Sequence, residues 1–405
     1  MSKVICDPKS VQDILEKGVQ EIYPNRAFLE KKLLSGQRLK LYCGFDPSAS
    51  SLHIGNAILL NKLSEFQALG HEVIFLVGSF TGMIGDPTDK TAARQKLTRK
   101  QVLNNAKLYK GQACRYLKFS GNNKARLLYN SQWHDKLSFK NLLEITSNFT
   151  VQQMIQRDMF QARIKDEKPI FLHEFLYPVA QGYDSVVMNV DLEIGGNDQM
   201  FNMMAGRDLM KAMTGKEKCV LTMKLLSDDD GKKMGKSEGN AVFLTDSPEN
   251  MYGKVMSWAD GVLASAFELT TNLAWEEIKQ IQNDLKVGSL NPRDAKMKLA
   301  YTITRMNFGE KKAKVAQDYF IKTVQNKEMP DEIKTLRLDL EKVNILELLL
   351  QTKLVASKGE ARRLIEQKGI KIDEQVIDDV NLEVDLKHGK IIQKGKRGFI
   401  KVIGK

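Results

Sequence analysis

Two short segments of the sequence carry residues that could bind phosphate. The first, His53-Ile54-Gly55-Asn56, lies between an apolar stretch and the expected start of a helix. The unpaired N–H groups and the dipole of a helix N-terminus favour phosphate, to which a histidine ring can also donate. Gly55 has no side chain where a nucleotide would approach the backbone. Taken alone, such a segment is more often an ordinary strand–helix turn with a surface histidine.

The second segment, Lys233-Met234-Gly235-Lys236-Ser237, follows an acidic, glycine-containing turn at residues 228–231. Two flexible ammonium groups on a glycine-containing loop can bind a triphosphate and hold its pyrophosphate end as negative charge develops. An isolated match of this length is more often a solvated basic loop. The two segments together, far apart in one chain, point to a single nucleotide site.

The pair of segments resembles the two signatures of the class I aminoacyl-tRNA synthetases, and the sequence between them resembles the tyrosyl-tRNA synthetase family. The motifs that carry this resemblance are Tyr42-Cys43-Gly44-Phe45-Asp46-Pro47, Gly82-Met83-Ile84-Gly85-Asp86-Pro87, Tyr177-x-x-x-Gln181-x-x-Asp184 and Gly195-Gly196-Asn197-Asp198-Gln199. The C-terminal module is similar to an S4 RNA-binding domain of bacterial-type members. The resemblance therefore covers nearly the whole chain.

The resemblance implies a tyrosine site made of Tyr42, Asp86, Tyr177, Gln181, Asp184 and Gln199. Tyr42 and Asp184 would hold the substrate phenol, because a buried phenol needs a donor and an acceptor. Asp86, Tyr177 and Gln181 would hold the α-ammonium group. The spacing of Tyr177, Gln181 and Asp184 offers an independent check, because residues three or four apart share one face of a helix.

The resemblance also implies an ATP site, with catalysis by positioning and charge stabilisation rather than by a protein nucleophile. The implied ATP-binding residues are Asp46, Ser48, His53, Gly55, Asn56, Gly196, Asp198, Lys233, Lys236 and Ser237, and the implied catalytic residues are His53, Asn56, Lys90, Arg94, Lys233 and Lys236. Mg²⁺ would accompany ATP through its phosphates, with no metal bound tightly by the protein. Two residues depart from the family pattern: Asn56 replaces a histidine, and Gly235 replaces a serine.

The pattern of apolar residues predicts the elements that must position these groups. Strands are expected at residues 38–45, 73–77, 126–129, 190–194 and 221–226, with helices at 55–69 and 98–117 between them. Alternating strands and amphipathic helices predict an α/β fold with a Rossmann-like, doubly wound parallel sheet. We expect this catalytic domain over residues 1–244, an all-α domain over 245–328, a linker over 329–342 and a small α+β, S4-like domain over 343–405.

The charge of the chain favours a polyanionic partner, since its formal net charge is +12 and phosphate binding releases counterions. The candidate RNA-binding residues of the C-terminal module are Lys358, Arg362, Arg363, Lys368, Lys394, Lys396 and Arg397. A solvated, lysine-rich tail is the alternative. The four dispersed cysteines, with no CxxC pair and no long apolar run, indicate a cytoplasmic protein that does not enter a membrane.

The expected activity is that of a tyrosine–tRNA ligase, with L-tyrosine, ATP and tRNA(Tyr) as partners. Family members are homodimers, and the apolar helices around residues 139–159 are either the dimer interface or core. Three other readings stay open: a tryptophanyl-specific synthetase, a catalytically silent RNA-binding relative, and a nucleotidyltransferase with an H-x-G-H site. The pair Tyr42 and Asp184 and the S4-like module count against the tryptophanyl enzyme. Lys233 and Lys236 count against a silent relative, and a nucleotidyltransferase would not need the S4-like module.

Overall fold

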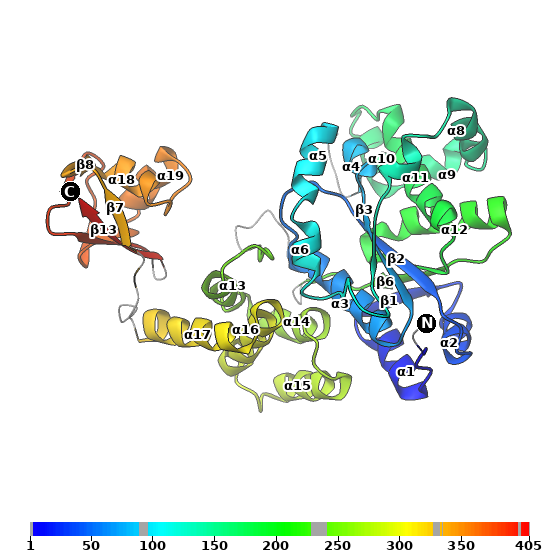
Figure 1. The fold of residues 1–405 in the computed structure, drawn as a ribbon, viewed down its shortest axis with the longest axis horizontal. Helices are drawn as coiled ribbons and strands as arrows, with labels where there is room; N and C mark the ends of the chain where they lie inside the picture. Colours follow the sequence, from blue (N-terminus) through cyan, green and yellow to red (C-terminus); the bar gives the residue numbers. More distant parts are fainter. Residues whose placement is uncertain are drawn as a thin grey trace. The chain divides into compact units, whose positions relative to one another are not determined.

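The structure is a computed structural model that describes residues 3–88, 96–227, 241–326, 333, 335–395 and 398–404. Its contacts divide the chain into two compact units, Met1–Gly309 and Glu310–Lys405. Each unit is described by itself below (Figure 1). The division into 1–244, 245–328, 329–342 and 343–405 stays a prediction.

The first unit is built on a six-stranded sheet in the order β1-β6-β5-β2-β3-β4. The strands are β1 (Val19–Tyr23), β2 (Lys40–Phe45), β3 (Glu72–Val77), β4 (Arg126–Tyr129), β5 (Leu192–Gly196) and β6 (Cys219–Met223). All neighbouring pairs are parallel except β1 with β6. The predicted doubly wound α/β sheet is thus confirmed. The antiparallel edge strand β1 has only partly buried or exposed residues, so it carries no continuous apolar run that would reveal it in the sequence.

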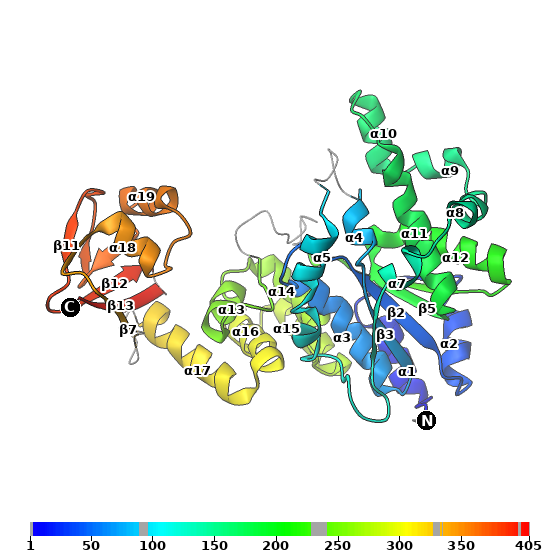
Figure 2. The same ribbon diagram turned by 45° about the horizontal axis from the view of Figure 1, so that its top comes forward.

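Helices cover both faces of this sheet. The helices of this part of the chain are α1 (Pro8–Glu16), α2 (Arg26–Leu34), α3 (Ile54–Ala68), α4 (Thr81–Ile84), α5 (Arg99–Ala106), α6 (Tyr109–Ala113), α7 (Ser131–His134), α8 (Phe139–Thr146), α9 (Val151–Ile155), α10 (Asp158–Lys165), α11 (Leu172–Met188) and α12 (Met200–Thr214). Figures 1 and 2 show α3 on one face and α11 with α12 on the other. The single helix expected over 98–117 is instead two helices, α5 and α6. Tyr109 of α6 donates a hydrogen bond from its hydroxyl to the Ala49 carbonyl (2.8 Å).

The topology places a crevice at the carboxyl end of β2. From β2 the chain runs outward through β3 to β4, and it then returns to β5 and β6 on the other side of β2. The helices that follow β2 and β5 therefore lie on opposite faces. Ligands of open α/β sheets bind at such a switch point, outside the carboxyl ends of the strands.

A helical segment completes the first unit, as the sequence predicts for residues after 245. It comprises α13 (Pro248–Val255), α14 (Leu263–Thr270), α15 (Trp275–Val287) and α16 (Pro292–Phe308). Ser247 and Asn291 cap α13 and α16, each followed by a proline at the start of the helix. Tyr252, Phe267 and Leu299 are buried in its core.

The second unit contains α17 (Glu310–Phe320), a π-helical turn (Ile321–Gln325) and a small α+β module. The module has strands β7 (Thr335–Leu338), β8 (Lys342–Asn344), β9 (Ile370–Ile372), β10 (Gln375–Val376), β11 (Glu383–Asp385), β12 (Lys390–Lys394) and β13 (Gly398–Gly404), with helices α18 (Ile345–Gln351) and α19 (Lys358–Glu366). The main sheet has the order β10-β9-β12-β13-β7. Strand β7 falls within the expected linker, yet it pairs in parallel with β13. No helix in the described parts of the chain is long and apolar enough to span a bilayer.

Candidate active site

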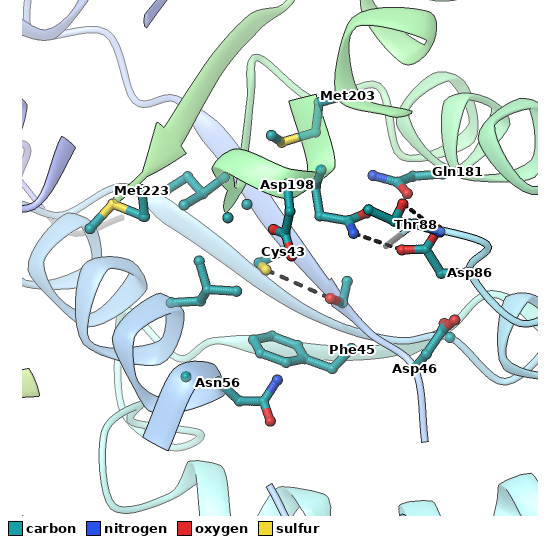
Figure 3. Close-up of a pocket in the computed structure, with 18 of the residues that line it drawn as sticks. Cys43, Phe45, Asp46, Asn56, Asp86, Thr88, Gln181, Asp198, Met203 and Met223 are labelled. Atoms are coloured by element: carbon teal, nitrogen blue, oxygen red, sulfur yellow. Dashed lines mark hydrogen bonds between the residues drawn. The ribbon is translucent and has the colours of Figure 1, made fainter. Parts of the chain in front are cut away.

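A cavity of about 540 Å³ opens at the switch point of the first sheet. Its lining includes every residue of the described chain that the sequence assigned to tyrosine or ATP: Tyr42, Asp46, Ser48, His53, Gly55, Asn56, Asp86, Tyr177, Gln181, Asp184, Gly196, Asp198 and Gln199. Figure 3 shows Asp86, Thr88 and Gln181 toward one side of this cavity and Asn56 toward another. The structure thus brings together residues far apart in the sequence, whereas the role of each stays a prediction.

Five of the predicted cationic-loop residues lie outside the described residues: Lys90, Arg94, Lys233, Lys236 and Ser237. The described chain on either side of the lysine segment meets the cavity region. Leu226, just before the segment, lines the cavity. Just after it, Val242 accepts a hydrogen bond from the Ile54 N–H (2.9 Å), and the Leu244 N–H donates to Leu52 (2.8 Å). The chain that follows the lysines is therefore paired with the segment that carries His53.

The start of α3 fixes the orientation of Asn56. The backbone N–H of His53 donates to Asn56 Oδ1 (3.0 Å), which caps the helix. Because the amide oxygen is used by the backbone, the amino group of Asn56 remains the end that can donate to a ligand. A Cβ on Gly55 would lie 2.9 Å from the His53 ring. Glycine at this position therefore permits the observed position of the imidazole.

Tyr42 and Asp184 are both buried at the deep end of the cavity. The Tyr42 hydroxyl lies 2.8 Å from Ser185 Oγ. Burial raises the pKa of Tyr42, and the nearby carboxylates Glu193 and Asp184 raise it further. The phenol of Tyr42 therefore stays protonated and can donate a hydrogen bond.

Asp184 is held by three donors that sequence reasoning missed. It accepts hydrogen bonds from Asn130 Nδ2 (3.1 Å), Trp133 Nε1 (2.7 Å) and His134 Nε2 (2.7 Å). Burial nevertheless raises the pKa of Asp184, and these hydrogen bonds oppose the rise. A carboxylate has about four lone-pair positions, so this arrangement leaves capacity for one further donor such as a phenol.

Tyr177, Gln181 and Asp184 line the same cavity from one helix, α11, which confirms the expectation drawn from their spacing. The Tyr177 hydroxyl donates to Asp46 Oδ2 (2.9 Å), and Thr81 Oγ1 donates to Asp46 Oδ1 (2.6 Å). Asp46, which we assigned to ATP, is therefore directly connected to the expected ammonium-binding group.

Asp86 belongs to a polar cluster that also includes residues from distant parts of the chain. It accepts from Gln199 Nε2 (2.7 Å) and from the backbone (3.0 Å) and hydroxyl (2.7 Å) of Thr88. The buried guanidinium of Arg157 donates to Thr88 Oγ1 (2.8 Å) and lies 3.8 Å from Asp86. Arg157 precedes α10, far from Asp86 in sequence, so nothing in the sequence indicates this contact.

The predicted ribose segment follows β5 directly. Asp198 belongs to a short 3₁₀ helix, Asn197–Gln199. A Cβ on Gly196 would lie 2.5 Å from Asp198 Oδ1. The glycine therefore leaves space for the carboxylate beside the strand end.

In the C-terminal module, Arg362, Arg363 and Lys368 are exposed. Two other candidates make intramolecular contacts: Lys358 pairs with Glu347 (2.6 Å), and Lys394 bonds to Glu360 and to the Leu354 carbonyl (both 2.7 Å). Lys396 and Arg397 lie outside the described residues. Arg362, Arg363 and Lys368 are thus the candidates best placed to meet a large anion.

Two family models match the chain. The model described as tRNA synthetases class I (W and Y) matches residues 34–325, and that of the Tyrosine--tRNA ligase SYY-like C-terminal domain matches residues 325–402. The chain is 40% identical to the Tyrosine--tRNA ligase of Thermotoga maritima over 398 residues, which cover 98% of each chain. It is 42% identical to that of Haemophilus ducreyi over 390 residues, covering 96% of each.

Solved structures agree with the fold. A C-terminally truncated mitochondrial tyrosyl-tRNA synthetase from Coccidioides posadasii matches with a TM-score of 0.62 at 24% identity, covering 76% of this chain and 91% of that one. The tyrosyl-tRNA synthetase from Archaeoglobus fulgidus complexed with L-tyrosine matches with a TM-score of 0.60 at 18% identity, covering 77% and 100%. From the family models and the nearly full-length relatives, this chain belongs to the class I tRNA synthetases and, within them, to the tyrosine–tRNA ligases.

Proposed function

We propose that the chain joins L-tyrosine to the 3′ end of tRNA(Tyr) in two steps at the cavity beside β2. In the first step, a carboxylate oxygen of tyrosine attacks the α-phosphorus of ATP, the bond to the bridging oxygen breaks, and pyrophosphate leaves. In the second step, a terminal ribose hydroxyl of the tRNA attacks the tyrosyl carbonyl, and AMP leaves. The observation that carries this proposal is the convergence on one cavity of every described residue that was assigned to tyrosine or ATP.

Each substrate group has a complementary partner in the proposed site. Tyr42 would donate a hydrogen bond to the phenol oxygen of the substrate, and Asp184 would accept a hydrogen bond from the phenol O–H. Asp86, Tyr177 and Gln181 would bind the α-ammonium group, while Gly196 and Asp198 would meet the ATP ribose and Gln199 the tyrosine side of the adenylate. His53 and Asn56 would donate to the phosphates as charge develops there.

Lys90, Arg94, Lys233 and Lys236 would neutralise the pyrophosphate as it leaves. Support comes from the described chain next to the lysine segment, because it is hydrogen-bonded to residues 52–54. Mg²⁺, held by the phosphates of ATP, would shield their charge when bound.

We also propose that two copies of the chain form a homodimer through α8 and the start of α11. A second cavity of about 370 Å³ there has apolar walls that include Phe139, Leu142 and Leu176. Phe139 and Leu172 are 75% and 80% exposed, and exposed apolar side chains beside an apolar groove are typical of an interface. Light scattering should give the mass of two chains, and Phe139→Asp should lower it; a monomeric wild type would reject this proposal.

Tyrosine-dependent exchange between ATP and pyrophosphate tests the first step. We expect exchange with tyrosine but not with tryptophan, and a loss of roughly 100-fold or more in Lys236→Ala, comparable to removal of another transition-state donor. Robust exchange in Lys236→Ala would remove the role given to the lysine segment. Exchange with tryptophan alone would favour the tryptophanyl reading, and exchange with no amino acid would favour a silent RNA-binding relative.

A further inference from the structure

An ion pair lies next to the end of the cavity that holds Tyr42 and Asp184, here called the tyrosine end. It joins Glu193 of β5 to Lys218, which directly precedes β6. The two side chains are 2% and 0% exposed, and the Lys218 ammonium contacts Glu193 Oε2 directly. Glu193 also lines the cavity, and it is the register neighbour of Tyr42 across β2 and β5. A charged pair therefore lies in the centre of the sheet, among strand residues that are mostly buried and apolar.

Stability alone does not account for this pair. Removing two charges from water costs several kcal/mol per ion, and a well-packed apolar pair is commonly as stable or more stable. Burial lowers the pKa of Lys218, and the attraction of Glu193 opposes that shift. The contacts that the pair makes with other residues indicate a different use.

Both members of the pair contact residues that line or support the cavity. Glu193 Oε1 accepts a hydrogen bond from Gln181 Nε2 (2.9 Å). Lys218 Nζ donates to Ser185 Oγ (2.9 Å), and this hydroxyl in turn meets the Tyr42 hydroxyl (2.8 Å). The pair thus supports two of the residues assigned to the substrate.

The contact with Glu193 determines which end of the Gln181 amide faces the cavity. An ionised carboxylate only accepts hydrogen bonds, whereas an amide has one donating and one accepting end. Because Glu193 takes the donating end, the carbonyl oxygen of Gln181 is left for a cation. We propose that Glu193 is a positioning residue that sets the Gln181 amide for the α-ammonium of tyrosine, with Lys218 holding Glu193 in place.

Two glycines make room for this arrangement. A Cβ on Gly206 of α12 would lie 2.8 Å from Lys218 Nζ and 3.1 Å from the Cα of Gly182 of α11. The close approach of the two helices therefore encloses the ammonium beside Ser185. A larger residue at position 206 would displace Lys218 without removing its charge.

The inference rests on the proposed function, because it concerns the ammonium of the tyrosine substrate. Its test is the substitution Glu193→Gln, which keeps the shape of the side chain. Lys218 donates at this position, so the oxygen of the new amide should face it and the new amino group should face Gln181. Gln181 would then turn its own amino group toward the substrate ammonium.

We expect Glu193→Gln to weaken binding of tyrosine and of tyramine by about tenfold, the effect of one hydrogen bond to a charged group. Binding of 3-(4-hydroxyphenyl)propionate, which lacks the ammonium, should change less than twofold. The double variant Glu193→Gln with Lys218→Met should recover most of the loss, because no ammonium then orients the new amide. Binding is measured as direct affinity for tyrosine and as inhibition of exchange by the two analogues.

Glu174→Gln is the matched control. Glu174 lies on the same helix as Gln181, is similarly buried and pairs with Arg163 (2.8 Å), and neither partner lines the cavity. Equal losses for all three ligands, or the same pattern in Glu174→Gln, would overturn the inference in favour of general loosening of α11. If Glu193→Gln does not fold, Glu193→Leu with Lys218→Met should show the ammonium-specific loss, and no such loss would overturn the inference. A wild type without tyrosine-dependent exchange would instead overturn the proposed function.

Discussion

The two ends of the cavity are built in different ways. At the tyrosine end, buried side chains from β2, α11 and the segment after β4 bond to one another, as Asp184 does with Asn130, Trp133 and His134. At the nucleotide end, the described residues assigned to ATP lie on the loop after β2, at the N-terminus of α3 and at the end of β5, and two of them are glycines. A small, uncharged phenol is recognised by fixed donors and acceptors, whereas a triphosphate is recognised chiefly by charge and N–H groups.

This difference has a consequence for substitutions. A change at the tyrosine end should alter affinity and selectivity for the amino acid, because each donor and acceptor there is held in place by fixed partners. A change at the nucleotide end should lower the rate and leave tyrosine affinity nearly unchanged, because charge at phosphorus develops only in the transition state.

The largest effect is expected for Asp184→Asn. The new amide would direct its amino group at one of three fixed donors and would remove the acceptor for the phenol proton. We expect kcat/KM for tyrosine to fall roughly 1,000-fold, since unsatisfied buried partners add to the lost hydrogen bond. Exchange assays with tyrosine and phenylalanine measure this change. Unaltered selectivity in a folded variant would show that Asp184 does not read the phenol.

A smaller effect is expected for His53→Ala at the nucleotide end. The loss of one donor to the developing phosphate charge should lower kcat for exchange roughly 100-fold. Tyrosine affinity without ATP, measured by fluorescence titration, should change less than twofold. A parallel loss of tyrosine affinity would contradict the separation of the two ends.

Trp133→Phe should sharpen the account of the tyrosine end through its pH dependence. The Trp133 N–H favours the charged form of Asp184, whose pKa is already raised by burial. Removing this donor should raise that pKa further, so tyrosine affinity should be lost at a higher pH on acidification. The pH profile of kcat/KM for tyrosine measures the shift. If the acidic side of this pH profile moves to lower pH instead, Asp184 is not the group whose ionisation controls tyrosine affinity.

The smallest effect on the first step is expected outside the cavity, for the exposed pair Arg362 and Arg363. Changing both to alanine should raise KM for tRNA(Tyr) by about tenfold and lower its dependence on salt, because fewer counterions are released. Exchange without tRNA should be unchanged. Lys401→Ala, which changes another exposed cation of the module, serves as the control for charge alone. An unaltered KM for tRNA would place the RNA contact elsewhere.

Several features of the site could be predicted because they depend on local sequence. Tyr177, Gln181 and Asp184 share a helix face by their spacing alone, and residues 53–56 lie where a strand passes into a helix. The sequence also indicates a partner for Glu193, since a carboxylate in an apolar, buried strand requires one. Asn130 and Trp133, which follow β4, are weaker candidates for the site from the sequence alone. Polar residues after a parallel strand lie at the edge of the sheet where ligands bind.

The identity of each partner could not be predicted in the same way. That Lys218 meets Glu193, or that Arg157 reaches Thr88, depends on strand order, register and the crossing of α11 with α12. The sequence by itself determined which chemical groups stand at strand ends and helix faces, because φ/ψ preferences and periodicity act over a few residues. Only the tertiary structure decided which of these groups bond to each other, because burial makes every donor and acceptor compete for partners brought in from distant parts of the chain.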